Sequence, residues 1–330
     1  MPDRPPPAVT PPSPPEEPRR ERRRRGSLRW KIAAALLLTL ATIGGVAIFA
    51  AAAVWARYAQ GLPELPSLTE YRPPVVTEIV SADGQLAGEL FVERRKVVPY
   101  SRIPRLLVQA FIASEDQNFF HHRGVDVVGT LRAAVNTYVL RRKVQGGSTI
   151  TQQTAKSLLV SAEGFTEGTR RDLRRKIREL ILARRLESAF SKEEILFLYL
   201  NGVYLGHHSY GVQSAAENYF RKNVEDLTLA EAALLAGLPQ APSRYSPFSN
   251  PEAAKTRRRY VLRRMAEERM ISDADRRAAE SAEVKVFGVD DVFREIAPFY
   301  AEHARRVSVE RYGNDRVLHD GLRAELAMDL

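Results

Sequence analysis

A pair of glycines and a pair of hydroxyl residues lead into a helix-forming run between Gly146 and Lys156. The first turns of the expected helix present three polar side chains, those of Gln152, Gln153 and Lys156. Backbone N–H groups at a helix N-terminus, together with a lysine, form a cradle for an anion such as a phosphate. The segment is not a P-loop, because the Gly-Lys-Ser/Thr order is missing. The alternative interpretation is an ordinary helix start with Ser148 or Thr149 as the N-cap.

A second charged segment runs from Arg174 to Glu179, on a helix that the apolar spacing predicts over 171–190. Glu179 lies about 200° around this helix from Ile177, and Arg175 lies one turn before Glu179. In one interpretation the charges form a solvated face, with an ion pair worth about 0.3–0.5 kcal/mol. In the other, a carboxylate held among cations is ready to meet a diphosphate.

Two adjacent acids meet two histidines and two aromatic residues between Glu115 and Gly124. A helix expected over 104–114 ends at these acids, where carboxylates oppose the helix dipole and are locally unfavourable. A locally costly choice of residue often marks a functional site. The alternative is a helix end followed by a solvated turn. Metal binding by His121 and His122 is disfavoured, because adjacent residues seldom ligate one metal together.

Two further segments indicate packing more than chemistry. The segment from Lys192 to Gly211 predicts a capped helix that stops at Asn201-Gly202 and is followed by core aromatic residues. Residues 229–245 predict a buried helix and a rigid turn. Asp273 and Asp275 have a spacing used to hold a metal and a diphosphate, but they lie in the first turn of an expected helix. No Gly-x-Ser-x-Gly elbow supports a serine hydrolase.

The elements that must position these segments are mainly helical. Residues Val75 to Val98 alternate as a β-hairpin, with Asp83-Gly84 as the turn. Helices are expected over 104–114, 126–141, 151–159 and 171–190, after capping boxes at Ser191 and Thr228, from 251 to about 270, and after Ser272. Because strands do not alternate with helices, a doubly wound parallel sheet is disfavoured. The sequence predicts a mainly α domain with a small β appendage at its start.

The N-terminal part of the chain has the pattern of a membrane anchor. Residues 32–56 carry no charged side chain and are long enough to cross a hydrocarbon layer of about 30 Å. The first 31 residues hold nine Lys/Arg and four Asp/Glu, which predicts a cytoplasmic tail and an external remainder. A cleaved signal peptide is the alternative, although its apolar core is commonly only about 7–15 residues. The expected divisions are a disordered Pro/Arg-rich tail over 1–29, a transmembrane helix over 30–57, a linker over 58–74, the main domain over 75–270, and a helical extension with the start of a linker over 271–330.

The composition of the chain limits the classes of partner and site that it can have. The 330-residue chain has a net charge of +10 and no cysteine, which excludes a disulfide framework, a thiolate zinc site and a cysteine nucleophile. Half of that net charge lies after the apolar stretch, so the external region is basic in its own right. This balance indicates an anionic partner, such as phosphates, lipid head groups or an acidic polymer. Nucleic acid is not expected outside a membrane, and the arginine run at 22–25 is interpreted as a topology signal.

Together, the charged segments resemble the peptidoglycan glycosyltransferase (transglycosylase) domain of class A penicillin-binding proteins and of monofunctional transglycosylases, glycosyltransferase family 51. The family motif Glu-Asp-x-x-Phe-x-x-His-x-Gly matches Glu115 to Gly124, Gly-x-Ser-Thr-Ile/Leu-Thr-Gln-Gln matches Gly146 to Gln153, and Arg-Lys-x-x-Glu matches Arg175 to Glu179. The family's Tyr-Leu-Asn and Gly-Leu-Pro segments match Tyr199 to Asn201 and Gly237 to Pro239. Order and spacing hold over about residues 75–270. Ser157 departs from the pattern, because many members carry Asn there.

The resemblance implies a lysozyme-like, mainly α fold and the polymerisation of lipid II into glycan strands by inverting transfer, with undecaprenyl diphosphate as the leaving group. Glu115 is then the general base on the acceptor sugar's 4-hydroxyl. Glu179 is the second carboxylate, which supports the donor diphosphate or a metal on it. The implied cofactor is at most a divalent cation, Mg²⁺ or Mn²⁺, with no organic cofactor. The implied substrate-binding residues are Asp116, Phe119, His122, Ser148, Thr149, Gln152, Gln153, Lys156, Arg175, Lys176 and Tyr204.

The same resemblance implies a single-pass protein of the bacterial inner (plasma) membrane with its catalytic domain outside. Its expected partners are lipid II, the growing glycan strand, membrane lipids, a transpeptidase domain on the full-length chain and cell-wall synthesis proteins. The sequence contains neither Ser-x-x-Lys nor Lys-Thr-Gly, so the chain is not expected to be acylated by β-lactams. We expect the amino-terminal part of a longer bifunctional protein rather than a natural monofunctional enzyme, because the last residues resemble the start of a linker strand.

Two alternatives remain open at this point. A lytic transglycosylase or lysozyme-type hydrolase of the same fold would use one glutamic acid with a raised pKa as general acid on finished polymer. A non-catalytic, membrane-anchored protein would merely hold cell-wall material. The basic residues beside Glu179 favour a diphosphate substrate over the first alternative, and the loss of turnover in a Glu115→Gln variant would separate an enzyme from the second.

Overall fold

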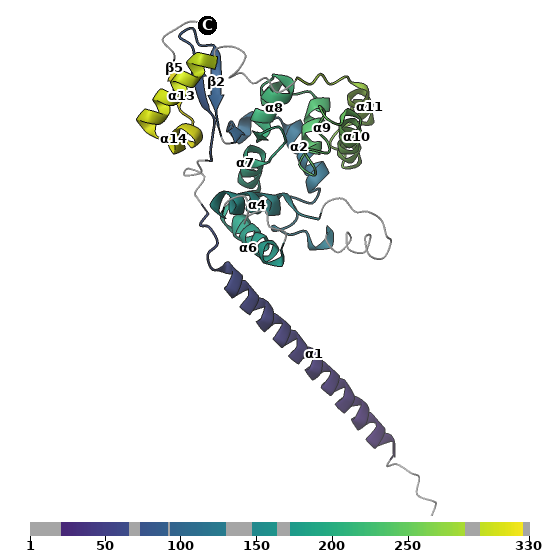
Figure 1. The fold of residues 1–330 in the computed structure, drawn as a ribbon. Coiled ribbons are helices and arrows are strands. Elements are labelled where there is room, and N and C mark those ends of the chain that lie inside the picture. Colours follow the sequence, from purple (N-terminus) through teal and green to yellow (C-terminus); the bar gives the residue numbers. More distant parts are fainter. Residues whose placement is uncertain are drawn as a thin grey trace, which may run out of the picture. The chain divides into compact units, whose positions relative to one another are not determined.

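The chain forms two compact units, Met1–Arg57 and Tyr58–Leu330. This is a computed structural model, and it describes residues 21–65, 73–91, 93–129, 147–163, 172–287 and 298–325. Figure 1 shows the course of the chain and the labels used for its helices and strands.

The described residues of the first unit lie in one long helix, α1 (Glu21–Ala59). Its part from Arg29 to Ala59 is long and apolar enough to cross a membrane, with a mean hydropathy of 2.4 in its most apolar window. Leu37 and Phe49 point to the surface, and an exposed helix that is apolar all round is typical of a membrane span. The disordered tail predicted over 1–29 is wrong from Glu21 onward, because arginine is a good helix former and extends an existing helix without a new nucleus. Residues 1–20 lie outside the described part.

The core of the second unit surrounds one very apolar helix, α9 (Leu229–Gly237). It packs against α2 (Arg105–Glu115) and α10 (Pro251–Glu267), with α7 (Lys192–Gly202), α8 (Val212–Phe220) and α11 (Asp273–Ser281) around them (Figure 1). Phe111, Tyr199, Leu235 and Met265 are completely or almost completely buried in this cluster. Because α9 buries almost every residue, it fixes the end of α2, where the predicted acids lie.

A second cluster joins α4 (Ile150–Glu163) to α6 (Leu173–Ala189) and to α7. Its buried residues include Leu159, Leu182, Leu186 and Leu198. The two helices thus lie side by side, as Figure 1 also shows. This packing brings the two polar segments of the sequence, one on each helix, to the same region. The predicted helix over 126–141 lies mostly in 130–146, outside the described residues.

The β appendage forms as predicted and gains a strand. Strands β1 (Thr77–Val80) and β2 (Leu86–Leu90) pair antiparallel around the expected turn, in which Gly84 has a φ of 83°. Strand β5 (Arg323–Glu325) pairs parallel to β1, and α13 (Pro298–Tyr312) and α14 (Asn314–His319) complete a small cluster with this sheet. Strands β3 (Arg94–Arg95) and β4 (Ser209–Tyr210) form a separate parallel pair.

The helix boundaries follow the predicted caps. The capping boxes at Ser191, Thr228 and Ser272 are all present, each with its reciprocal side-chain and backbone bonds. Short 3₁₀ helices lie at Tyr100–Arg102 and Val224–Asp226. The fold is therefore mainly α with small sheets, as the sequence predicts.

Candidate active site

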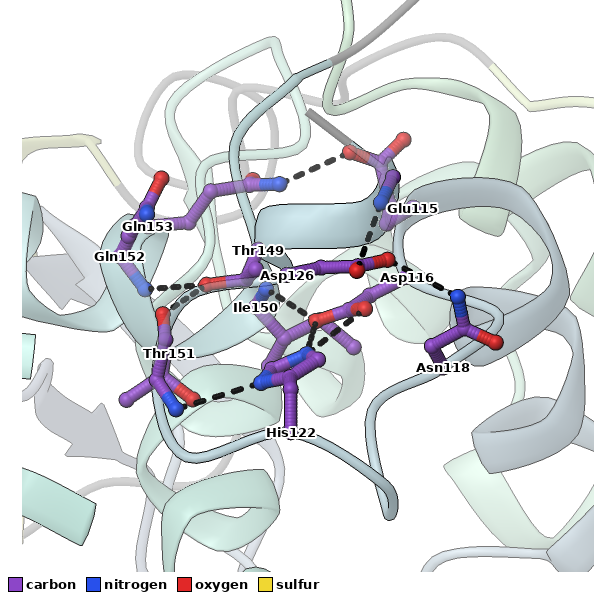
Figure 2. A network of polar contacts seen from close by, with 12 residues as sticks. Glu115, Asp116, Asn118, His122, Asp126, Thr149, Ile150, Thr151, Gln152 and Gln153 are labelled. Atoms are coloured by element: carbon purple, nitrogen blue, oxygen red, sulfur yellow. Dashed lines mark hydrogen bonds and ion pairs between the residues drawn. The ribbon is translucent and has the colours of Figure 1, made fainter. Parts of the chain in front are cut away.

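Glu115 is the last residue of α2, and its carboxylate has two partners from distant parts of the chain. The Gln153 Nε2 atom donates a hydrogen bond to Oε2 over 2.9 Å (Figure 2), and a guanidinium nitrogen of Arg257 lies 3.5 Å from Oε1. Burial raises the pKa of Glu115, against the lowering effects of Gln153 and Arg257, and the charge of Asp116 adds to the increase. A carboxylate with a raised pKa is a better proton acceptor at neutral pH.

Asp116 has a different role from its neighbour, because its carboxylate turns into the protein. It accepts hydrogen bonds from the Ile150 backbone N–H over 2.9 Å and from His122 Nε2 over 3.0 Å (Figure 2). The Gly124 backbone N–H donates to His122 Nδ1 over 3.2 Å, so the imidazole carries its proton on Nε2. These contacts tie the loop after α2 to the start of α4.

Three residues that the resemblance implies as substrate-binding are thus buried. The side chains of Asp116 and His122 are 3% and 8% exposed, and Phe119 is fully buried beneath the Lys192 ammonium group, 4.4 Å from its ring centre. The structure leaves these side chains little surface for contact with a substrate. They hold the loop that follows Glu115, and these contacts explain why Asp116 occurs at a helix end where the dipole disfavours an acid.

The start of α4 is capped by the chain itself and is not an open anion cradle. The Thr149 hydroxyl accepts a hydrogen bond from the Gln152 N–H over 3.2 Å and donates one to the Gly124 carbonyl over 2.7 Å. Gly124 has a φ of 88°, and a Cβ there would lie 3.0 Å from the Ala183 carbonyl oxygen. With the Ile150 N–H bonded to Asp116, the N-cap interpretation is the correct one.

The predicted cations do come together beside this helix start. The Lys176 ammonium group lies 3.0 Å from Ser148 Oγ, 3.3 Å from Gln152 Oε1 and 3.2 Å from Glu179 Oε2. Glu179 is buried and also pairs with Arg175. Burial lowers the pKa of Lys176, and the charges of Arg175 and Lys156 lower it further. An anion bound here would relieve the repulsion that Lys176 experiences from Arg175 and Lys156.

A pocket of about 490 Å³ opens beside α4. Of the predicted residues it contains Gln153, Lys156 and Tyr204. The full lining is Glu93, Arg95, Gln153, Lys156, Ser157, Val160, Ser161, Tyr199, Gly202, Val203, Tyr204, Tyr210, Pro239 and Pro242. The Tyr199 hydroxyl lies 3.4 Å from Gln153 Oε1, and burial, followed by the charges of Glu115 and Asp116, raises the pKa of Tyr199. Gln153 therefore connects the pocket with the Glu115 carboxylate.

Polar residues of this region that the sequence did not predict include Glu93, Arg95, Tyr210 and Arg257. Arg257 had a visible signal, because it lies on the apolar stripe of α10 together with Ala254 and Val261. The others had none. They meet through the pairing of β3 with β4, two strands of two residues each and far apart in the sequence.

The described residues do not form a metal site on their own. In the described part of the chain, no group of three or more His, Cys, Asp or Glu side chains is placed to hold an ion. Glu179, the one implied ligand, is already engaged by Arg175 and Lys176.

A mainly α domain thus carries a partly buried glutamate, a pocket lined by the glutamine that bonds this glutamate, and a cation cluster beside the same helix. Residues 83–266 match the family model described as Transglycosylase. The chain belongs to this family.

Two curated relatives agree with this assignment. The chain is 45% identical over 254 residues to penicillin-binding protein 1A of Neisseria gonorrhoeae, covering 77% of this chain and 31% of the relative. It is 47% identical over 213 residues to penicillin-binding protein 1A of Aquifex aeolicus, covering 64% and 28%. A crystal structure of penicillin-binding protein 1A from Haemophilus influenzae aligns with a TM-score of 0.43 and 26% identity, covering 77% of this chain and 26% of that one. The chain thus spans about a third of the length of its curated relatives.

Proposed function

We propose that this chain is a membrane-anchored peptidoglycan glycosyltransferase that polymerises lipid II into glycan strands. One observation carries the proposal. The Glu115 carboxylate is hydrogen-bonded to Gln153, and Gln153 lines a pocket that is also lined by Lys156, whose charge acts on Lys176 beside the same helix. An acid that accepts protons and a group of cations that attracts a diphosphate thus meet at one helix, α4.

Glu115 serves as the general base in this proposal. It takes the proton from the 4-hydroxyl of the acceptor sugar while that oxygen forms a bond to the anomeric carbon of the donor. Burial of Glu115 raises its pKa and makes it a stronger base than a solvated carboxylate. A sugar hydroxyl is a poor nucleophile, so a positioned base contributes about 10²- to 10⁴-fold in rate.

The cations of α4 and α6 act on the other reactant. As the anomeric bond of the donor breaks, its electron pair and negative charge pass to the leaving undecaprenyl diphosphate. Lys156, Arg175 and Lys176 stabilise this growing charge more than they stabilise the ground state. Glu179 keeps Arg175 and Lys176 in place through its two ion pairs.

The anchor gives the enzyme access to a lipid-linked substrate. We propose that α1 crosses the inner membrane with its basic N-terminal end in the cytoplasm, in keeping with the excess of arginine in the first 31 residues. The domain that follows then lies outside, at the surface where the lipid head groups are. Lipid II and membrane lipids are the partners that this arrangement requires.

Polymerisation of purified lipid II tests the proposal. Wild-type protein in detergent is expected to lengthen glycan strands. The Glu115→Gln variant should lose turnover while still binding lipid II. The Glu179→Gln variant should lose part of its turnover. The same assays with and without a chelator report any need for a divalent cation. A lytic enzyme of the same fold would leave lipid II untouched and cut finished strands instead, and a binding protein would be indifferent to Glu115→Gln.

A further inference from the structure

Helix α10 braces the end of α2 at two points. Arg257 reaches Glu115, and Arg264 reaches the side-chain oxygen of Gln117. The two arginines are seven residues apart, which places them on the same face of the helix. A third contact from this side of the core links the Ser114 hydroxyl to the Ala236 carbonyl at the end of α9, over 3.0 Å. The residues around the proposed base are therefore held from α9 and α10.

Arg257 is held more firmly than an ordinary surface arginine. Its side chain is 5% exposed, and its Nε donates a hydrogen bond to the Gly237 carbonyl over 3.2 Å. The guanidinium carbon lies 4.5 Å from the ring centre of Tyr260 and 5.6 Å from that of Tyr245. Contacts with aromatic faces favour a cation, and burial makes its partner groups costly to remove. Because the Arg257 guanidinium is fixed in this way, it restricts the position of the Glu115 carboxylate with which it pairs.

We infer that Arg257 is a positioning residue for the proposed glycosyl transfer, holding the Glu115 carboxylate in place and keeping it ionised so that it can accept the acceptor's proton. The inference rests on the proposed function for its catalytic meaning. The effect of the Arg257 guanidinium on the Glu115 carboxylate does not depend on which substrate is bound. Arg257 itself need not touch the sugars.

The charged groups around Glu115 determine which way this control acts. Asp116, next in the chain, raises the pKa of Glu115, and Tyr199 of α7 faces it as a neutral phenol. Gln153 of α4 contributes a hydrogen bond and no charge. Arg257 is the only cation among the described groups that shift the pKa of Glu115. Without it, burial would keep the carboxyl protonated to higher pH, and a protonated acid cannot act as a base.

Two variants separate charge from position. Arg257→Gln removes the positive charge but retains a hydrogen-bond donor for the Gly237 carbonyl. Gly237→Ala keeps the charge and displaces it, because a Cβ at position 237 would lie 2.8 Å from Arg257 Cγ. Arg263→Met is the matched control, since Arg263 is on the same helix, 61% exposed, and paired with Glu267 over 3.6 Å.

The experiment has two readouts on the full-length protein in detergent. The first is the pH dependence of kcat for lipid II polymerisation. The second, independent of activity, is an infrared titration of protein labelled with ¹³C-glutamate, in which the Glu115 carboxyl band is the one absent from Glu115→Gln. Thermal unfolding of each variant checks that it is folded.

Arg257→Gln is expected to lower kcat at least tenfold, with little change in KM, and to move the acidic limb and the Glu115 titration to higher pH by about one unit. The Gly237→Ala variant should move the acidic limb of kcat and the Glu115 titration in the same direction, but by less. The Arg263→Met variant should leave both unchanged. The inference is overturned if folded Arg257→Gln and Gly237→Ala titrate Glu115 as the wild type does. A wild type that fails to polymerise lipid II would refute the proposed function, whereas the infrared titration would still decide the role of Arg257.

Discussion

The side chain of Gln153 contacts the Glu115 carboxylate at 2.9 Å through its nitrogen, and the same side chain lines the pocket beside α4. One glutamine thus connects the group that would take a proton with the space that would hold a sugar. Its oxygen lies near the Tyr199 hydroxyl, which fixes the orientation of the amide. A rotation that exchanged the amide nitrogen and oxygen of Gln153 would lose both contacts.

Substitution of Gln153 is therefore expected to affect chemistry more than binding. Gln153→Met keeps the size of the side chain but removes the hydrogen bond that lowers the pKa of Glu115. The acidic limb of kcat should move to higher pH, and kcat at neutral pH should fall about tenfold. Tyr199→Phe, which leaves the amide nitrogen free to donate, should have a smaller effect. If Gln153→Met raised KM alone, Gln153 would be a substrate contact and not a support for the base.

Glu115→Gln should lower the polymerisation rate by about 10²- to 10⁴-fold, the usual contribution of a positioned base. The amide has nearly the same shape, so binding of lipid II should persist. Glu252→Gln, an exposed acid in the first turn of α10, is the control and should leave the rate unchanged. Single-turnover measurements would separate the two steps. Near-normal turnover in Glu115→Gln would exclude this residue as the base.

The pH dependence of the wild type follows from two opposed shifts. Burial raises the pKa of Glu115, so the ionised base should be lost, as pH falls, sooner than for an ordinary glutamate with a pKa of about 4.3. Burial and two neighbouring cations lower the pKa of Lys176, so its charge should be lost, as pH rises, sooner than for an ordinary lysine. A bell-shaped kcat profile with both limbs displaced inward is the expected result. Glu115→Gln should abolish the acidic limb of its residual activity.

The cation cluster should contribute to the transition state rather than to the fold. Lys156→Met and Lys176→Met are each expected to lower kcat/KM by about 10²-fold, because a cation that stabilises a leaving diphosphate acts mainly in the transition state. Lys255→Met, an exposed lysine of α10, is the matched control. Unchanged thermal stability with lost activity would support the proposal. An equal loss of kcat/KM in the Lys255→Met control would show that the effect comes from the net charge of the protein and not from the cation cluster.

Local patterns in the sequence were sufficient for much of this architecture. The three capping boxes and the hairpin depend on residues a few positions apart, so their chemistry can be read from the chain. The start of α4 was harder, because the group that bonds the Ile150 N–H is Asp116, 34 residues earlier. The open anion cradle that the local sequence permitted is filled by a carboxylate from another segment.

Long-range contacts account for the rest of what was missed. Arg257 meets Glu115 across 142 residues, and no periodicity predicts which buried cation will face which acid. The wall of the pocket around Arg95 depends on a pairing between two strands of two residues each. Such short strands carry no alternation of apolar and polar residues. The fold class was within reach of the sequence, whereas the partners of the base were not.

Asp116 offers a test between a structural role and a binding role. Asp116→Asn leaves the buried His122 Nε2–H and the Ile150 N–H to share a single carbonyl oxygen. A buried donor without a partner costs about 1–3 kcal/mol, so the unfolding temperature should fall. KM for lipid II should stay close to the wild-type value. A raised KM with unchanged stability would restore Asp116 as a substrate contact.

The wall of the pocket that the sequence did not reveal should contribute to binding. Arg95 is almost completely buried, pairs with Glu93 over 2.7 Å and lies 5.3 Å from the ring centre of Tyr210. Burial, followed by the charge of Glu93, raises the pKa of Tyr210 to about 12, so its hydroxyl stays neutral at physiological pH and this wall keeps its form.

Arg95→Met should therefore raise KM for lipid II about tenfold, equivalent to about 1.4 kcal/mol, because it removes the contacts with Glu93 and Tyr210 that hold this wall in shape. The base is not touched, so kcat should stay within a few-fold of the wild-type value. Arg102→Met, an exposed arginine paired with Glu225, serves as the control. A KM that stays unchanged in a folded Arg95→Met variant would show that the substrate does not reach this wall. The lipid II sugars would then occupy the end of the pocket near Lys156 and Gln153.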